Sequence, residues 1–191
     1  MPQDKVKDLL QQHQAALDLL VSQQFDDLER IGQKLTGAFN EGNKLLIAGS
    51  GLLSPVGGII ASMFQHRLHL ERPPLPAFAL GNDLALAPSL QRDRLEELLL
   101  ARQFDFIGQN GDMVLLLADG KHDPCILNLA EQLQQQNAPF FLIKPNSQEW
   151  TGPTPDTTIG LIGETGGEIA ATTLFCGQTL CSLVEHALFG I

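Results

Sequence analysis

The sequence predicts an α/β fold, a three-layer sandwich in which helices cover both faces of a five-stranded parallel sheet. A long helical segment precedes the first strand. Two observations lead to this fold class. Five short apolar runs, of the kind that buried parallel strands need, alternate with longer segments whose apolar residues recur at helical spacing. Strands that alternate with helices form right-handed βαβ units, and these units place helices on both sides of a sheet.

The N-terminal segment is expected to be one long amphipathic helix or two helices in series. Apolar residues recur at helical spacing from Val6 to Phe39, and no proline lies between them. A helical stretch of this length before any strand often packs on a partner subunit. We therefore assign residues 1–41 to a helical segment used in oligomer packing, and residues 42–191 to the domain that holds the sheet.

The remaining elements follow from the alternating pattern. The expected strands are 44–48, 75–80, 113–118, 139–144 and 158–162, and the expected helices are 55–70, 90–107, 124–136 and 167–189. Asp123 is expected to cap the third of these helices, because Pro124 follows it at the first helical position. The polar stretch 146–157 is expected to be a loop within the domain.

Composition excludes several classes of function. The 191 residues include 12 lysines and arginines against 22 aspartates and glutamates, which gives a formal net charge of −10. Binding to a phosphate backbone depends on cationic side chains, so we expect no direct contact with nucleic acid or with an anionic membrane. The three cysteines form no CxxC pair, and the N-terminus does not resemble a signal peptide. These features predict a cytoplasmic protein.

Ligands of parallel sheets bind at the carboxyl ends of the strands, which directs attention to the turns after Ala48, Leu80 and Ala118. The first turn, Gly49-Ser50-Gly51, begins like a dinucleotide fingerprint, but the third glycine is missing. We favour a tight turn into a helix. The third turn carries acidic side chains where a phosphate loop would need free N–H groups, so helix capping is favoured there over catalysis.

No metal or cofactor is expected. His66 and His69 lie three residues apart and Glu71 follows, but no third ligand is evident, and a solvated helix end is favoured. Sequence alone places no base beside a serine or cysteine nucleophile. Cys176 and Cys181 are five residues apart on the last expected helix and do not share a face.

A resemblance to a known family rests on several motifs. The most specific is the run Glu71-Arg-Pro-x-Leu-Pro-Ala-x-Ala-Leu80, accompanied by Gly42-Asn43-Lys44, Gly49-x-Gly51, Asp93-Arg94-Leu95 and Gly111-Asp112. Together they resemble a sugar isomerase (SIS) domain of the phosphoheptose isomerase group, and within it the proteins that associate with the replication initiator DnaA. The resemblance implies a five-stranded parallel sheet and a homotetramer or dimer of dimers with active sites at subunit interfaces.

The sequence departs from the family's site pattern. Leu53 replaces a serine that helps to hold a sugar phosphate, and Ile59 and Met63 replace a histidine and a glutamate. The second phosphate loop of the family is replaced by 118–123, and the polar residues of its last helix by Ala170-Ala171-Thr172-Thr173 and Gln178. The resemblance thus predicts a degenerate sugar-phosphate pocket, no catalytic residue and no enzyme. The residues of this pocket would be Gly49, Ser50, Gly51, Leu52, Leu53, Asp119 and Gly120.

The expected function is that of a non-catalytic SIS oligomer that binds a DnaA-type initiator and promotes its assembly at the origin. Leu188 and Phe189, near the end of the last expected helix, match a pair through which the family contacts DnaA. The alternative is a sedoheptulose 7-phosphate isomerase or a sugar-phosphate-binding protein. A regulator with its own DNA-binding module is disfavoured, because the sequence has no basic face.

Overall fold

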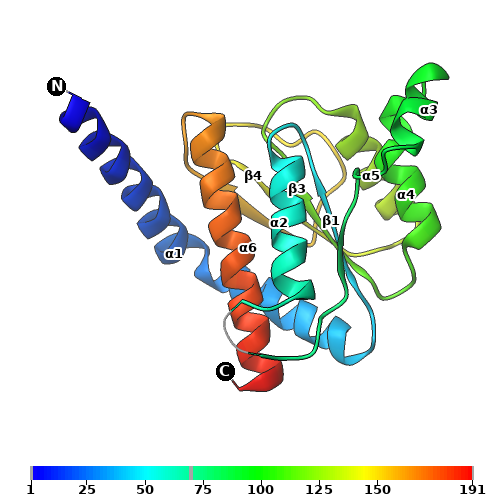
Figure 1. Cartoon of the computed structure of the whole chain (residues 1–191), viewed down its shortest axis with the longest axis horizontal. Coiled ribbons are helices and arrows are strands. Elements are labelled where there is room, and N and C mark those ends of the chain that lie inside the picture. Colours follow the sequence, from blue (N-terminus) through cyan, green and yellow to red (C-terminus); the bar gives the residue numbers. More distant parts are fainter. Residues whose placement is uncertain (1, 69–70, 191) are drawn as a thin grey trace.

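The computed structural model describes residues 2–68 and 71–190 and contains a five-stranded parallel sheet in the order β2-β1-β3-β4-β5 (Figure 1). The fold class predicted from the sequence is confirmed. The strands are β1 (Leu45–Gly49), β2 (Ala77–Ala79), β3 (Met113–Leu117), β4 (Phe140–Pro145) and β5 (Thr157–Leu161). The helices are α1 (Pro2–Asn40), α2 (Leu53–Gln65), α3 (Leu86–Arg92), α4 (Leu99–Ile107), α5 (Pro124–Gln135) and α6 (Gly166–Phe189), with a single 3-10 turn, η1 (Glu96–Leu98).

Strand order gives the sheet a switch point beside β1. The chain runs from β1 to β2 on one side and then crosses to β3 on the other side of β1. The connections after β1 and β3 therefore leave the sheet in opposite directions, which opens a crevice at their carboxyl ends. This crevice is where a ligand of the sheet is expected.

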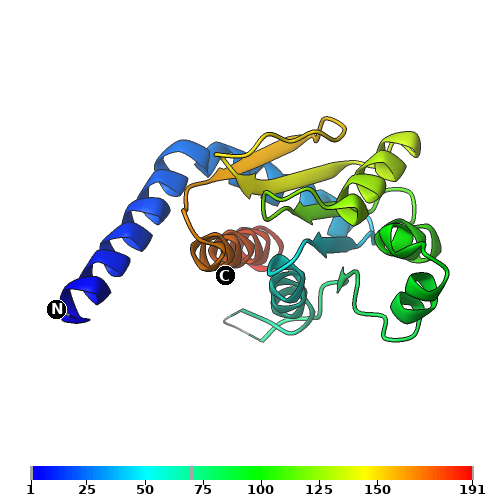
Figure 2. The same ribbon diagram turned by 90° about the horizontal axis from the view of Figure 1, so that it is seen from above.

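Helices cover both faces of the sheet, so the strands are buried on both sides. Alternate residues of β1 face different cores: Leu45 and Ile47 pack with α1, α2 and α6, whereas Leu46 and Ala48 pack with α4 and α5. Figure 1 is seen from the side of α2 and α6, and Figure 2 shows the sheet between its two helical layers. Residues of one strand that alternate between two cores give the continuous apolar runs seen in the sequence.

The N-terminal segment is one continuous helix, which decides between the two arrangements left open by its sequence. Its second half belongs to the core, where Leu28, Ile31 and Leu35 are buried. Its first half projects from the body of the molecule in both views (Figures 1 and 2) and exposes apolar side chains such as Val6 and Leu9. Packing of this segment on a second copy of the chain stays a prediction.

Two predicted helices were wrong in their extent. The segment 90–107 is not one helix, because Arg94 adopts a left-handed backbone conformation (φ 59°) that separates α3 from η1 and α4. The helix predicted over 55–70 ends at Gln65. There the guanidinium of Arg72 donates to the carbonyl oxygens of Met63 and Phe64, which a longer helix would use for its own backbone. Asp123 caps α5 as predicted.

Helices α2 and α6 approach each other closely at Gly177. A Cβ atom added there would lie 2.4 Å from Cγ1 of Ile60, which is fully buried. Only a residue without a side chain lets the two helices approach so closely. Within the described residues, no helix is long and apolar enough to cross a membrane.

We expect Gly177→Ala to lower the free energy of unfolding by about 1–3 kcal/mol, because the methyl group overpacks the contact between α2 and α6. Gly37→Ala is the matched control, since nothing lies within 4 Å of a Cβ at that position of α1. The control should be neutral or stabilising by up to about 1 kcal/mol, because alanine favours a helix over glycine. Urea unfolding of both variants measures the difference, and equal stabilities would contradict the close approach.

Candidate functional site

A cavity of about 530 Å³ lies at the carboxyl edge of the sheet, next to the switch point. Four strand ends contribute to it, those of β1, β3, β4 and β5, together with the first residues of α2 and α6. We call it the edge cavity. Its lining residues are Gly51, Leu52, Leu53, Asp119, Lys121, Pro145, Ser147, Gln148, Gly163, Glu164, Thr165, Gly166 and Ile169.

The turn after β1 holds one wall of the edge cavity in place. Leu53 N–H donates to the carbonyl of Ser50 at 2.8 Å, so the turn is as tight as the glycines of the sequence indicated. The buried Ser50 hydroxyl accepts the N–H of Asp119 at 2.8 Å, which joins this turn to the loop after β3. Gly51 has a positive φ of 47°, and a Cβ there would lie 2.7 Å from Oδ2 of Asp119. The Asp119 carboxylate therefore lies directly against the backbone of Gly51.

The opposite wall is the start of α6. Thr165 and Glu168 form a capping box, in which each side chain accepts the backbone N–H of the other. Hydrogen bonds from the N–H groups of Thr165 and Glu164 lower the pKa of the Glu168 carboxyl. Within the described chain, the N–H groups of Gly166 and Gly167 find no acceptor. A helix of 24 residues thus presents two free N–H groups at its positive end, an arrangement that favours an anion.

Side chains of both charges face the edge cavity. Lys121 is its single cation among the described lining residues, and Asp119 and Glu164 are its carboxylates. The Asp119 carboxylate accepts the backbone N–H of Lys121 at 3.0 Å, which fixes the position of the acid. A cation and a helix N-terminus can hold a phosphate, while a carboxylate can take and return a proton.

The pocket predicted from the sequence is distributed over three places. Gly51, Leu52, Leu53 and Asp119 line the edge cavity. Gly49 and Ser50 lie beneath it, where a Cβ at Gly49 would lie 2.3 Å from the carbonyl oxygen of Leu53.

Gly120 lines a neighbouring cavity instead. Ile59 and Met63, the apolar replacements on α2, are not among the lining residues of the edge cavity, and Ile59 is 47% exposed.

Lys121, Glu164 and Gly166 also line the cavity, although none of them belongs to the pocket predicted from the sequence. The spacing Thr165-x-x-Glu168 is a capping-box signal and could have located the start of α6 beside the ligand edge. Nothing in the sequence indicated that the β5–α6 turn and the loop after β3 face each other. The polar residues of the cavity include Asp119, which belongs to the predicted pocket, and Lys121 and Glu164, which do not.

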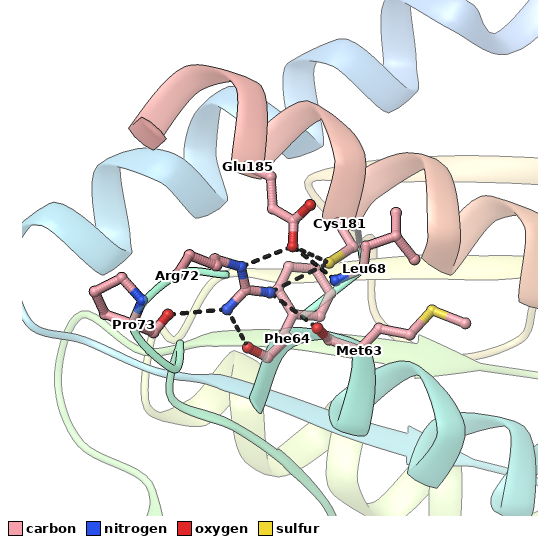
Figure 3. Close-up of polar contacts among 7 residues, drawn as sticks. All are labelled: Met63, Phe64, Leu68, Arg72, Pro73, Cys181 and Glu185. Carbon is pink, nitrogen blue, oxygen red and sulfur yellow. Dashed lines mark hydrogen bonds and ion pairs between the residues drawn. The ribbon is translucent and has the colours of Figure 1, made fainter. Parts of the chain in front are cut away.

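The C-terminal end of α6 carries a second polar cluster, buried among helices (Figure 3). Arg72 pairs with Glu185 at 2.7 Å, and their side chains are 1% and 3% exposed. The same carboxylate accepts the N–H of Leu68 at 2.9 Å. The Arg72 guanidinium also donates to carbonyl oxygens of α2 and of Pro73. These contacts join the connection after α2 to the last helix.

The predicted partner-binding pair lies at this same end of α6. Phe189 is 36% exposed, and its ring centroid lies 6.0 Å from the Arg72 guanidinium carbon. Leu188 is half-buried and packs against the core of α1, α2 and α6. Phe189 retains an accessible ring, and contact with a partner through Leu188 and Phe189 stays a prediction.

The cysteines are poor nucleophiles in this fold. Burial raises the pKa of the Cys176 thiol to about 12. Burial, together with the neighbouring Glu185 carboxylate, raises the pKa of the Cys181 thiol to about 11. Both are therefore protonated near neutral pH. Among the described residues, no group of three or more histidines, cysteines and acids is placed to hold a metal ion, and His69 lies outside those residues.

Comparison with known proteins places the fold. No protein-family model matches the sequence. A phosphoheptose isomerase of Thermodesulfovibrio yellowstonii is 24% identical over 189 residues, 99% of this chain and 94% of that protein. The structure of a phosphoheptose isomerase from Francisella tularensis superposes with a TM-score of 0.88 at 18% identity, and covers 97% of this chain and 99% of that one. The enzyme GmhA from Neisseria gonorrhoeae gives a TM-score of 0.81 at 12% identity over the same shares.

The chain has the five-stranded parallel α/β fold of the SIS type that is found in phosphoheptose isomerases of solved structure. Proteins named phosphoheptose isomerase are also similar to it in sequence over most or nearly all of its length. The expectation that the chain is not an enzyme is contradicted by these comparisons, because the similar proteins carry the name phosphoheptose isomerase and point to an enzyme.

We expect Arg72→Met to lower the free energy of unfolding by about 3–5 kcal/mol, because it leaves the buried Glu185 carboxylate without its cation. Arg92→Met is the control, since Arg92 pairs with Asp93 at the surface and such pairs contribute about 0–1 kcal/mol. Denaturant titrations followed by circular dichroism measure both. A cost for Arg72→Met no greater than that of the control would contradict a central role for the buried pair.

Proposed function

We propose that the chain binds a phosphorylated sugar in the edge cavity and interconverts its aldose and ketose forms, as the names of its relatives indicate for them. The observation that carries this proposal is the pairing of an anion site with carboxylates in one cavity. The free N–H groups of Gly166 and Gly167 and the cation of Lys121 can hold the phosphate. Sedoheptulose 7-phosphate is the substrate that we propose to test first.

Asp119 is the residue proposed to move the proton. Isomerisation transfers a proton between two neighbouring carbons of the sugar, which requires a base held beside them. The carboxylate of Asp119 accepts the backbone N–H of Lys121, and the backbone N–H of Asp119 donates to the Ser50 hydroxyl. Both the side chain and the backbone of Asp119 are therefore held in place. Glu164 also lines the cavity, but it lies exposed at the β5–α6 turn.

We expect the wild-type chain to convert sedoheptulose 7-phosphate into its aldose isomer, with product followed by NMR. Asp119→Asn should lower turnover by about 100-fold or more while it retains binding, because a general base contributes about 10²–10⁴-fold. Asp26→Asn, an exposed change on α1, is the matched control. Calorimetry separates the two parts of the proposal: binding without product overturns the isomerase activity, and no binding overturns the site itself.

A second candidate function rests on Phe189. We propose that the chain also binds a DnaA-type initiator, as the initiator-associating protein DiaA does, with the exposed ring of Phe189 as an anchor. Aromatic residues, phenylalanine among them, are enriched at the centre of protein interfaces. In this proposal the chain acts as an oligomer that presents several copies of the same anchor, which strengthens binding through avidity.

Calorimetric titration with the N-terminal domain of the cognate initiator tests this second candidate. We expect Phe189→Ala to weaken binding by about tenfold or more, and Phe106→Ala, which removes an 89% exposed ring elsewhere, to leave it unchanged. Light scattering and circular dichroism establish that each variant retains its mass and fold, because Phe189 also touches Arg72. Absence of binding by the wild-type chain would overturn the proposal.

A further inference from the structure

A separate cavity, of about 210 Å³, lies between the first half of α1 and the β5–α6 turn. We call it the α1 cavity. One face of α1 forms one wall, and Ile162, Gly163 and Glu164 of the turn form the other, together with Glu168 of α6. The α1 cavity and the edge cavity have only Gly163 and Glu164 in common. Most of its wall is therefore formed by residues that the proposed isomerisation does not use.

The body of the α1 cavity is apolar. Leu19 and Ile162 are 36% and 42% exposed, although both are large apolar side chains. The small side chains of Ala15 and Ala16 leave the space beside them open. An apolar cavity of about 150 Å³ is sufficient to bind benzene, so the α1 cavity has room for an apolar body of about six or seven carbon atoms.

The charged groups of the α1 cavity are acids. Glu164 and Glu168 line it, and its described lining residues include neither lysine nor arginine. Hydrogen bonds from the N–H groups of Thr165 and Glu164 lower the pKa of the Glu168 carboxyl, and the nearby His13 lowers it further by a smaller amount. Glu168 is therefore ionised near neutral pH. A neutral His13 leaves the cavity with two negative charges, so a cationic ligand is favoured over a neutral or anionic one.

Three side chains of the α1 cavity have acceptor atoms to offer. Throughout residues 2–68 and 71–190, the carboxylate of Glu164 forms neither a hydrogen bond nor an ion pair, and only its backbone N–H is engaged. The side chains of Gln12 and His13 likewise form no hydrogen bond within these residues. A carboxylate, an amide oxygen and a neutral imidazole nitrogen all accept hydrogen bonds, and an ammonium group has three protons to donate.

We propose that the α1 cavity binds a small primary amine with an apolar body, such as an arylalkyl amine. The apolar body lies against Leu19 and Ile162, and the ammonium group donates to Glu164, with Gln12 and His13 as further acceptors. Apolar walls with a few polar groups that fix the orientation are the usual composition of a small-molecule site. Because Glu164 also lines the edge cavity, the bound cation offsets a negative charge beside the proposed anion site.

Benzylamine is the compound with which to test this proposal, because one carbon joins its benzene ring to its ammonium group. We expect it to shift the ring-proton resonance of His13 in a saturable way, as measured by proton NMR. His13→Gln assigns this resonance among those of the five histidines. Benzyl alcohol, which lacks the charge, and methylamine, which lacks the ring, should each bind at least about tenfold more weakly.

Variants locate the amine within the molecule. Ala15→Leu fills the α1 cavity and should abolish the shift, whereas Gln11→Leu adds the same side chain at an exposed position outside the lining and should leave it unchanged. Glu164→Gln should weaken binding by about tenfold, because a charge-assisted hydrogen bond is lost, and the exposed Glu149→Gln is its control. Asp119→Asn, which alters only the edge cavity, should leave the titration unchanged.

Four results would overturn the inference. The first is no saturable shift in the wild-type chain, and the second is a midpoint that stays the same in both Ala15→Leu and Glu164→Gln. The third is loss of the shift in Asp119→Asn, which would place the amine in the edge cavity. The fourth is a dissociation constant that rises with protein concentration, which would place a second copy of the chain in the α1 cavity. Product formation from sedoheptulose 7-phosphate is measured separately, so the proposed isomerase activity stands or falls on its own.

Discussion

The buried ion pair between Arg72 and Glu185 joins the end of α2 and the connection after it to the last helix, 113 residues further along the chain. The Arg72 guanidinium ends α2 by taking its last carbonyl oxygens, while Glu185 fixes the last helix against the same point. Two charges without water are stable only when each is fully paired, so the position of α6 relative to α2 is strongly determined. The start of α6, which forms a wall of the edge cavity, depends on this placement.

The edge cavity brings together polar groups from segments that are separate in the sequence. Its free N–H groups come from the start of α6, its ammonium group from Lys121, and its carboxylates from the turns after β3 and β5. None of these groups lies at the α2 positions of Ile59 and Met63, where apolar residues led to the expectation of an inactive chain. The comparisons with phosphoheptose isomerases correct that expectation, and the cavity offers polar groups on which activity can be tested.

Periodicity was sufficient to predict the layers and the five strands, because residues buried on both faces of a sheet leave continuous apolar runs. Periodicity did not predict the helix ends where a single residue changes the course of the backbone. Arg94 breaks a helical pattern through its left-handed backbone, and Arg72 ends α2 from a distance of several residues. The site was predicted only in part. Gly51, Leu52, Leu53 and Asp119 line the edge cavity, but the approach of the β5–α6 turn is a tertiary contact that no local pattern encodes.

Helix α6 spans the molecule from the edge cavity to the end that carries Phe189. With 24 residues at 1.5 Å each it is a rod of roughly 36 Å, with the free N–H groups of Gly166 and Gly167 at one end and Phe189 at the other. It packs closely on α2 at Gly177, between the two ends, where Ile60 leaves no room for a Cβ atom. The two ends of α6 lie roughly 36 Å apart, so a molecule bound at Phe189 would not touch the free N–H groups of Gly166 and Gly167.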